Sequence, residues 1–136
     1  LFPYTTLFRS GACLLVIVGA IIISILTAGK KPFKDLAPSD IVSASVQLSP
    51  PDTTIQIEDI EELVRLLNEV VIYREDNSYT EYVGQGVIFT LSLSDGTYKE
   101  IIAYYPFLIL DRVGYQTEYE PCQALNSYAN ELLNGK

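Results

Sequence analysis

The feature that most constrains this chain is a long apolar run near its start. Residues 12 to 28 are seventeen consecutive positions at which only Ser24 and Thr27 are polar, and both hydroxyls can bond back to a helix carbonyl. As an α-helix the run would be about 26 Å long, slightly short of a hydrocarbon core of about 30 Å. Lys30 and Lys31 follow it directly. The chain therefore divides into an apolar segment, residues 11–29, and a domain that follows it.

Three interpretations of the apolar run compete: an uncleaved transmembrane anchor, a cleaved signal peptide, or a buried helix of a soluble protein. The apolar core of a signal peptide is usually shorter, and Leu26-Thr27-Ala28 is a poor cleavage site, so we favour the anchor. Lys30, Lys31 and Lys34 would by themselves argue for a cytoplasmic domain. A single anchor, a linker and a tyrosine-rich β domain are typical of exported proteins. We therefore expect a single-pass protein of the cell membrane with an extracytoplasmic domain.

The first ten residues, LFPYTTLFRS, differ in character from the rest of the chain. They resemble, residue for residue, the in-frame translation of a common sequencing-adapter oligonucleotide. The chain also lacks methionine throughout. We interpret residues 1–10 as an artefact, exclude them from fold reasoning as a tag would be excluded, and expect the native start to lie elsewhere.

Composition narrows the function classes. Acidic residues outnumber basic ones 17 to 9, for a net charge of -8, and this balance disfavours a nucleic-acid partner because phosphate binding needs clustered Lys and Arg. Histidine is absent, which removes the usual catalytic base and a common zinc ligand. We expect no metal site and no cofactor. Cys122 is the only cysteine after the apolar run, so the domain cannot close a disulfide within itself.

The first half of the domain changes from strand to helix periodicity. Residues 30–40 hold two prolines and mixed charge, which indicates a linker. From 41 to 48 the chain alternates, and we expect Val42, Ala44, Val46 and Leu48 on the buried side of a strand. A turn at 49–52 and a short strand at 53–57 follow. From residue 58 apolar positions recur at helical spacing, which predicts an amphipathic helix.

The second half predicts a strand beginning at residues 71–73, two hairpins and a last helix. We interpret REDNS, residues 74–78, as a polar turn rather than a calcium loop, because the mid-loop glycine of such loops is missing. One hairpin spans residues 85–106 around Asp95-Gly96. The other joins 107–110 to 114–119, with Gly114 suited to a left-handed turn position. The last helix is expected to begin at Glu120-Pro121.

These elements predict the fold class. The order ββαββββα, with one apolar face per hairpin and two amphipathic helices, indicates an α+β protein. We expect residues 41–136 to form a two-layer sandwich, an antiparallel sheet of about five or six strands with two helices on one face.

Tyrosine and Cys122 are the candidate functional residues. Nine of the ten tyrosines lie in the domain. Strands favour aromatic residues in any case, but tyrosine is also enriched at interfaces. Cys122 could be a nucleophile near a helix N-terminus, yet it shares a helical stripe with Leu125 and Leu132, which favours a buried apolar thiol. The possible partner-binding surface comprises Tyr79, Tyr82, Tyr98, Tyr104 and Tyr115.

Four stretches carry a resemblance to a known group of proteins: KPFKDL, SDIVSASVQLSPPD, YTEYVGQGVIFTLSLSDGT and GYQTEYEPCQALNSYANELL. Together they resemble an uncharacterised family of small membrane-anchored extracytoplasmic domains from anaerobic Gram-positive bacteria. Similar domains follow membrane antirepressor proteases of the kind that sense β-lactams. The resemblance implies location and fold and transfers no catalytic residue.

Three functions follow in order of preference. The first is a membrane-tethered, non-enzymatic binding or sensory domain for a protein or peptide partner. The second is an accessory or inhibitor-like domain that docks on a membrane enzyme. The third is an enzyme that depends on Cys122.

Overall fold

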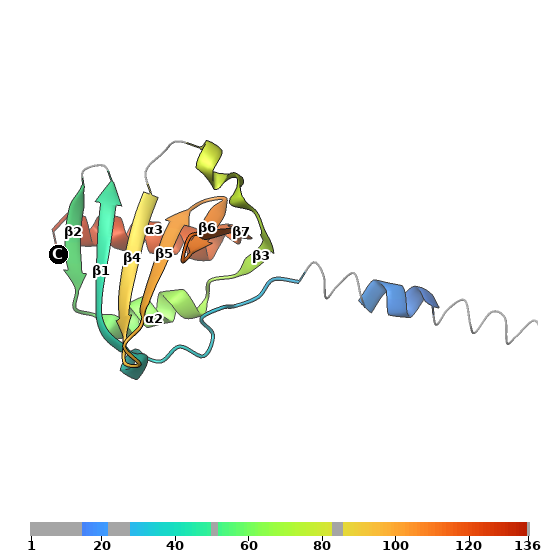
Figure 1. The fold of residues 1–136 in the computed structure, drawn as a ribbon, viewed down its shortest axis with the longest axis horizontal. Helices are drawn as coiled ribbons and strands as arrows, with labels where there is room; N and C mark the ends of the chain where they lie inside the picture. The colour runs from blue at the N-terminus through green and yellow to red at the C-terminus, as the bar shows by residue number, and fades with distance from the viewer. Residues whose placement is uncertain (1–14, 22–27, 50–51, 83–85, 136) are drawn as a thin grey trace, which may run out of the picture.

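The computed structural model describes residues 15–21, 28–49, 52–82 and 86–135 of the 136-residue chain. Residues 1–10, which we interpret as an artefact, lie outside this part. Residues 15–21 are helical, and the domain that follows is drawn in Figure 1. Its elements are η1 (Pro38–Asp40), β1 (Ile41–Ser49), β2 (Thr53–Ile57), α2 (Ile60–Asn68), β3 (Ile72–Glu75), η2 (Asn77–Glu81), β4 (Gly86–Leu93), β5 (Tyr98–Tyr104), β6 (Phe107–Leu110), β7 (Val113–Thr117) and α3 (Tyr119–Leu133).

The strands form a seven-stranded sheet in the order β2-β1-β4-β5-β6-β7-β3, and every neighbouring pair is antiparallel. The predicted α+β class is confirmed. The expected count of five or six strands was too low. The weakest sequence signal belongs to β3, a four-residue edge strand whose register with β7 shifts between Ile72 and Glu75.

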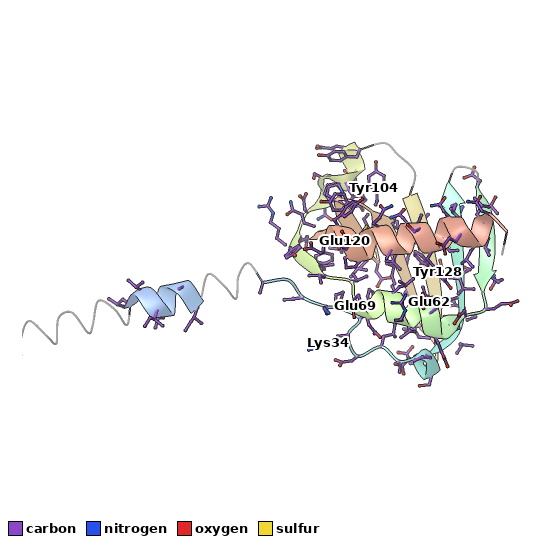
Figure 2. All side chains as sticks on the ribbon, turned by 180° about the vertical axis from the view of Figure 1, so that it is seen from behind. Lys34, Glu62, Glu69, Tyr104, Glu120 and Tyr128 are labelled. Carbon is purple, nitrogen blue, oxygen red and sulfur yellow. The ribbon has the colours of Figure 1, made fainter. Side chains whose placement is uncertain are left out.

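Both helices cover the same face of the sheet, as Figures 1 and 2 show from opposite sides. Helix α2 begins at Asp59, whose carboxylate accepts the N–H of Glu62 at 3.0 Å, the usual N-cap interaction. Tyr128 of α3 lies between the helices, and its hydroxyl donates to the Asp59 carbonyl at 3.4 Å. The fully buried centre of the core comprises Val46, Leu48, Leu63, Leu67, Val70, Val87, Phe89, Leu91, Ile101, Leu108, Cys122 and Leu125.

The alternation predicted for β1 holds only in part. Ala44, Val46 and Leu48 are buried as expected, but Val42 is 69% exposed and Ile41 is buried in its place. The register with β4 shifts between Ile41 and Ser43. A β-bulge adds one residue to a strand and so reverses the side to which earlier side chains point. The prediction for Val42 was therefore wrong.

Residues 30–40, which we expected as a linker, contribute to the domain. Phe33 is 6% exposed and belongs to the core, with Leu36 packed beside it. The side-chain amide of Asn68 donates to the carbonyls of both residues, at 2.5 Å and 3.2 Å. Asn68 therefore joins this segment to the end of α2.

The hairpin of β6 and β7 differs from the prediction at its turn. Asp111 and Arg112 hold the positive φ angles, 48° and 75°, as a two-residue type I′ turn requires. Gly114 lies inside β7 instead of in the turn. A Cβ at Gly114 would lie 2.5 Å from the Asp76 carbonyl oxygen and 2.6 Å from the Tyr79 ring. The glycine is therefore needed for close packing, since a side chain would collide with the segment that crosses it.

The described part of the apolar run lies outside the core. Leu15, Val16, Ile17, Val18 and Ile21 are between 45% and 75% exposed, and Figure 2 shows their helix standing clear of the domain. This exposure contradicts a buried core helix for residues 15–21. In the described part of the chain no helix has the length and apolar composition needed to cross a membrane. Residues 11–14 and 22–27 of the expected anchor, residues 11–29, lie outside the described residues.

Replacing Gly114 with alanine should destabilise the domain by about 1–3 kcal/mol, because the new methyl group overlaps backbone and ring atoms. Gly86→Ala is the matched control: its Cβ would lie 3.6 Å from the nearest atom, a side-chain carbon of Ile102. Urea unfolding followed by circular dichroism measures both. Equal stability of the two variants would contradict the contact with Tyr79 and Asp76.

Candidate functional site

The candidate site is the face of the sheet that the helices leave uncovered. Strand alternation directs polar side chains of β1, β2, β4 and β5 to this face, because the other side chains of the same strands fill the core. One cross-strand row joins Gln56, Ser45, Thr90 and Glu100. A second row joins Ser43, Ser92 and Tyr98. We call this region the polar face.

The polar face is slightly hollowed. A shallow depression of about 160 Å³ lies over β1, β2, β4 and β5. Tyr98 borders it and is 73% exposed. The groups around it are neutral hydrogen-bond donors and acceptors beside one aromatic ring, which suits recognition of a polar or cationic side chain. Its lining comprises Ser43, Ala44, Ser45, Gln56, Thr90, Ser92 and Tyr98.

The other half of this face is apolar and is covered by η2. Phe107 and Ile109 of β6 point away from the helices yet are only 3% and 2% exposed. The ring centroids of Tyr79 and Tyr82 lie 6.3 Å and 5.4 Å from that of Phe107. The Tyr79 hydroxyl donates to the Arg112 carbonyl at 3.2 Å. These two tyrosines therefore help to close a second, small apolar cluster.

The REDNS turn is held by hydrogen bonds within the protein. Asp76 accepts the backbone N–H of Ser78 at 3.0 Å, its hydroxyl at 2.7 Å and the Gln116 amide at 3.0 Å. The Ser78 hydroxyl is the main group that holds the pKa of Asp76 below its ordinary value. Among the described residues no group of three or more Cys, Asp or Glu is placed to hold a metal ion. The predicted polar turn is limited to Asp76, because Arg74 and Glu75 end β3 and Asn77 and Ser78 begin η2.

The five tyrosines of the predicted surface do not lie together. Tyr98 borders the depression, and Tyr104, half-buried, is paired with Phe107 on the same side of the sheet. Tyr79 and Tyr82 cover Phe107. Tyr115 faces the other way: it is paired with the buried Leu108 and packs against the core. Four of the five are thus on the helix-free side, spread over its polar and apolar halves.

A further tyrosine cluster, which the sequence reasoning missed, lies where the apolar run joins the domain. Tyr73, Tyr105 and Tyr119 are 38%, 48% and 46% exposed. The rings of Tyr105 and Tyr119 meet edge to face, with centroids 4.9 Å apart. Tyr73 donates a short hydrogen bond to Glu118, the residue before Tyr119. We call these three residues the edge tyrosines.

Cys122 lies in the core instead of at the surface. It is 0% exposed, and burial raises the pKa of its thiol to about 11 despite an opposing hydrogen bond from the backbone of Tyr105. A thiol nucleophile acts as the thiolate, and with this pKa about one thiol in ten thousand is ionised at neutral pH. The interpretation as a buried apolar cysteine therefore fits the geometry better than a reactive one.

The hydroxyl-lined depression was also missed, although a signal for it exists. Ser43, Ser45 and Gln56 are the polar members of alternating strands, and alternation alone predicts only that they face solvent. Their convergence depends on the register between β1, β2 and β4. Long-range register of this kind cannot be obtained from local alternation.

Cys122 should resist labelling in the folded protein. In a Cys13→Ser background we expect a maleimide at pH 8 to modify Cys122 only after denaturant is added, because the thiol is buried and protonated. Gln123→Cys in the same background is the control, since the neighbouring position of α3 is exposed. Labelling of native Cys122 as rapid as that of the thiol introduced by Gln123→Cys would revive the enzyme hypothesis.

The comparisons with known proteins add no relative. The chain matches no protein-family model, no curated protein and no solved structure. The resemblance to small anchored domains of Gram-positive bacteria therefore stays a prediction. The arrangement of side chains on the sheet and its edges is what bears on function.

Proposed function

We propose that this protein is a membrane-tethered, non-enzymatic binding domain whose polar face receives a protein or peptide partner outside the cytoplasm. The observation that carries the tether is the exposure of Leu15, Val16, Ile17, Val18 and Ile21, beside a domain whose own core is closed. An apolar helix with every large side chain exposed to water is unfavourable, because each such side chain is worth about 1.5–3 kcal/mol on burial. A bilayer would bury all of them.

The junction between the apolar run and the domain supports the same proposal. Lys30 pairs with Ile72 of β3 through two backbone hydrogen bonds of 2.8 Å. A Cβ at Gly29 would collide with Val71 and lie 3.0 Å from the Tyr73 ring. The apolar segment thus leaves the domain directly beside the edge tyrosines, without a flexible spacer between Gly29 and the sheet.

The chemistry around this junction suits the interface of a membrane. Tyrosine is enriched there because its ring is apolar and its hydroxyl is polar. Lys30, Lys31 and Lys34 border an open hollow of about 620 Å³ at the same place. The amine of Lys31 is paired with Glu69 at 3.2 Å, and the stems of Lys30 and Lys34 can lie along lipid while their amines reach headgroups. We propose that the edge tyrosines and these lysines rest on the bilayer surface.

The binding role rests on what the polar face offers. The lining of its depression consists of neutral hydroxyl and amide groups and the exposed ring of Tyr98, which can recognise a ligand; Glu100 lies at the end of one row, beyond this lining. The buried Cys122 is on the opposite, helix-covered side of the sheet. The geometry therefore supports binding over catalysis.

The tether predicts that the full chain floats with lipid vesicles in a density gradient. Ile17→Lys together with Ile21→Lys should leave the protein in the lower fractions, since each lysine in a spanning helix costs about 2.5–3.5 kcal/mol. Ile17→Leu with Ile21→Leu is the matched control and should float. A full chain that stays at the bottom of the gradient would refute the tether.

The contact of the edge tyrosines with the bilayer can be tested by tryptophan fluorescence, because the chain has no native tryptophan. In vesicles that contain brominated lipids, we expect the fluorescence of a Tyr105→Trp variant to be quenched, since bromine near the headgroups quenches indole by contact. Tyr98→Trp is the control: it lies on the polar face, away from the edge tyrosines, and should keep its fluorescence. If only Tyr98→Trp were quenched, the polar face would lie on the bilayer, which would contradict the proposed orientation.

A further inference from the structure

The two edges of the sheet are protected to different degrees. At one edge, β3 is covered by the backbone of Lys30, carries the charged Arg74 and Glu75, and has an irregular register with β7. Covering, charge and irregularity are the devices by which proteins prevent an edge strand from pairing with another chain. The β3 edge is thus closed to strand addition.

The opposite edge, β2, shows none of these devices within the strand. Its sequence, TTIQI, has no charge, proline or glycine. Its register with β1 is regular over five consecutive pairs, from Leu48 with Thr53 to Ala44 with Ile57. The backbone N–H and C=O groups that point away from β1 are therefore arranged as a template for one more strand.

We propose that β2 binds an extended, basic segment of a partner polypeptide, which adds to the sheet as an eighth strand. This inference rests on the proposed function and names the class of partner. The charge comes from the residues around the end of β2: Glu58 follows the strand directly, and Glu61 is exposed in the first turn of α2. The chain as a whole carries a net charge of -8, which favours a cationic partner.

Charge also argues against a second copy of this chain as the occupant. Two β2 strands paired antiparallel about a two-fold axis would place the strands of two acidic domains side by side. Each copy would place its Glu58 beside the start of the other copy's strand, next to the acidic Asp52 of that copy. Like charges placed together at an interface suppress association, so a basic segment from another polypeptide fits this edge better.

The side chains of β2 define a pattern for the segment. Ile55, on the core side, is only partly buried, and an apolar side chain beside it would complete its burial. Gln56, on the other side, heads the polar row that continues through Ser45 to Thr90. A segment that alternates apolar and polar residues satisfies both sides of the strand. Its polar residues would extend the polar face.

The position of β2 suits a tethered protein. Six strand spacings separate β2 from β3, the strand beside which the apolar segment leaves the domain. At about 4.8 Å per spacing, the open edge lies about 29 Å from the junction. Figure 1 shows β2 at the far side of the sheet from residues 15–21. A partner could therefore reach β2 without crossing the surface that faces lipid.

The test is a selection of random short peptides, displayed on phage, against the full chain in detergent micelles. We expect the selected peptides to alternate apolar and polar residues and to carry Lys or Arg. Bound peptide should slow hydrogen exchange of those β2 amides that point away from β1. Glu58→Lys and Gln56→Lys should each weaken binding about tenfold, since both place a cation where the partner carries one. Gln47→Lys, exposed on the same face but one strand inward, should bind normally.

Several results would overturn the inference. These are the absence of any enriched peptide, full affinity for both edge variants, or unchanged exchange of the β2 amides on binding. Binding that is lost in Tyr98→Ser but kept in Glu58→Lys would move the site to the polar face, which refutes the strand addition and keeps the proposed function. Because the selection uses micelles, a failure of the vesicle flotation would affect the tether alone. Circular dichroism of each variant verifies folding before its affinity is read.

Discussion

The rest of the structure depends on one constraint. Two helices bury one face of this antiparallel sheet, and they leave the other face uncovered. Helices α2 and α3 cover the side on which Val46, Phe89 and Ile101 converge. The opposite side is tolerable in water only where its side chains are polar. This division of one sheet into a closed side and an open side creates the polar face.

Two apolar side chains on the uncovered side of the sheet explain the segment that crosses it. Phe107 and Ile109 point away from the helices and need a cover of their own. The segment from Asp76 to Tyr82 supplies it, fastened by the hydrogen bonds of Asp76 and by the close approach of Tyr79 to Gly114. Residues that looked like a calcium loop or a recognition surface are thus largely accounted for by this cover.

Local patterns were enough to predict the class of fold, most element positions and the side of the sheet on which the helices lie, because strand and helix periods differ and each amphipathic helix needs an apolar surface. What they missed depends on long-range geometry. A bulge buries Ile41 in the core and exposes Val42. Gly114 allows the Tyr79 ring to pack against β7 and does not form the turn. Of the predicted surface, Tyr98 is exposed beside the depression, while Tyr115 faces the core because β7 pairs with β6 in a register that no local signal encodes.

The two edge strands of the sheet differ, so the two ends of the domain have different roles in the proposed function. The edge beside Lys30 joins the apolar segment, and the edge at β2 stays open. A strand of five residues offers a small area, so a peptide bound there would have modest affinity in solution. In the tethered state proposed above, a partner held at the same membrane would meet β2 at a raised effective concentration, which can reach millimolar for short linkages. A weak edge would therefore suffice for the proposed tethered domain, and the same weakness would leave it inert toward strands that are not held at the same surface.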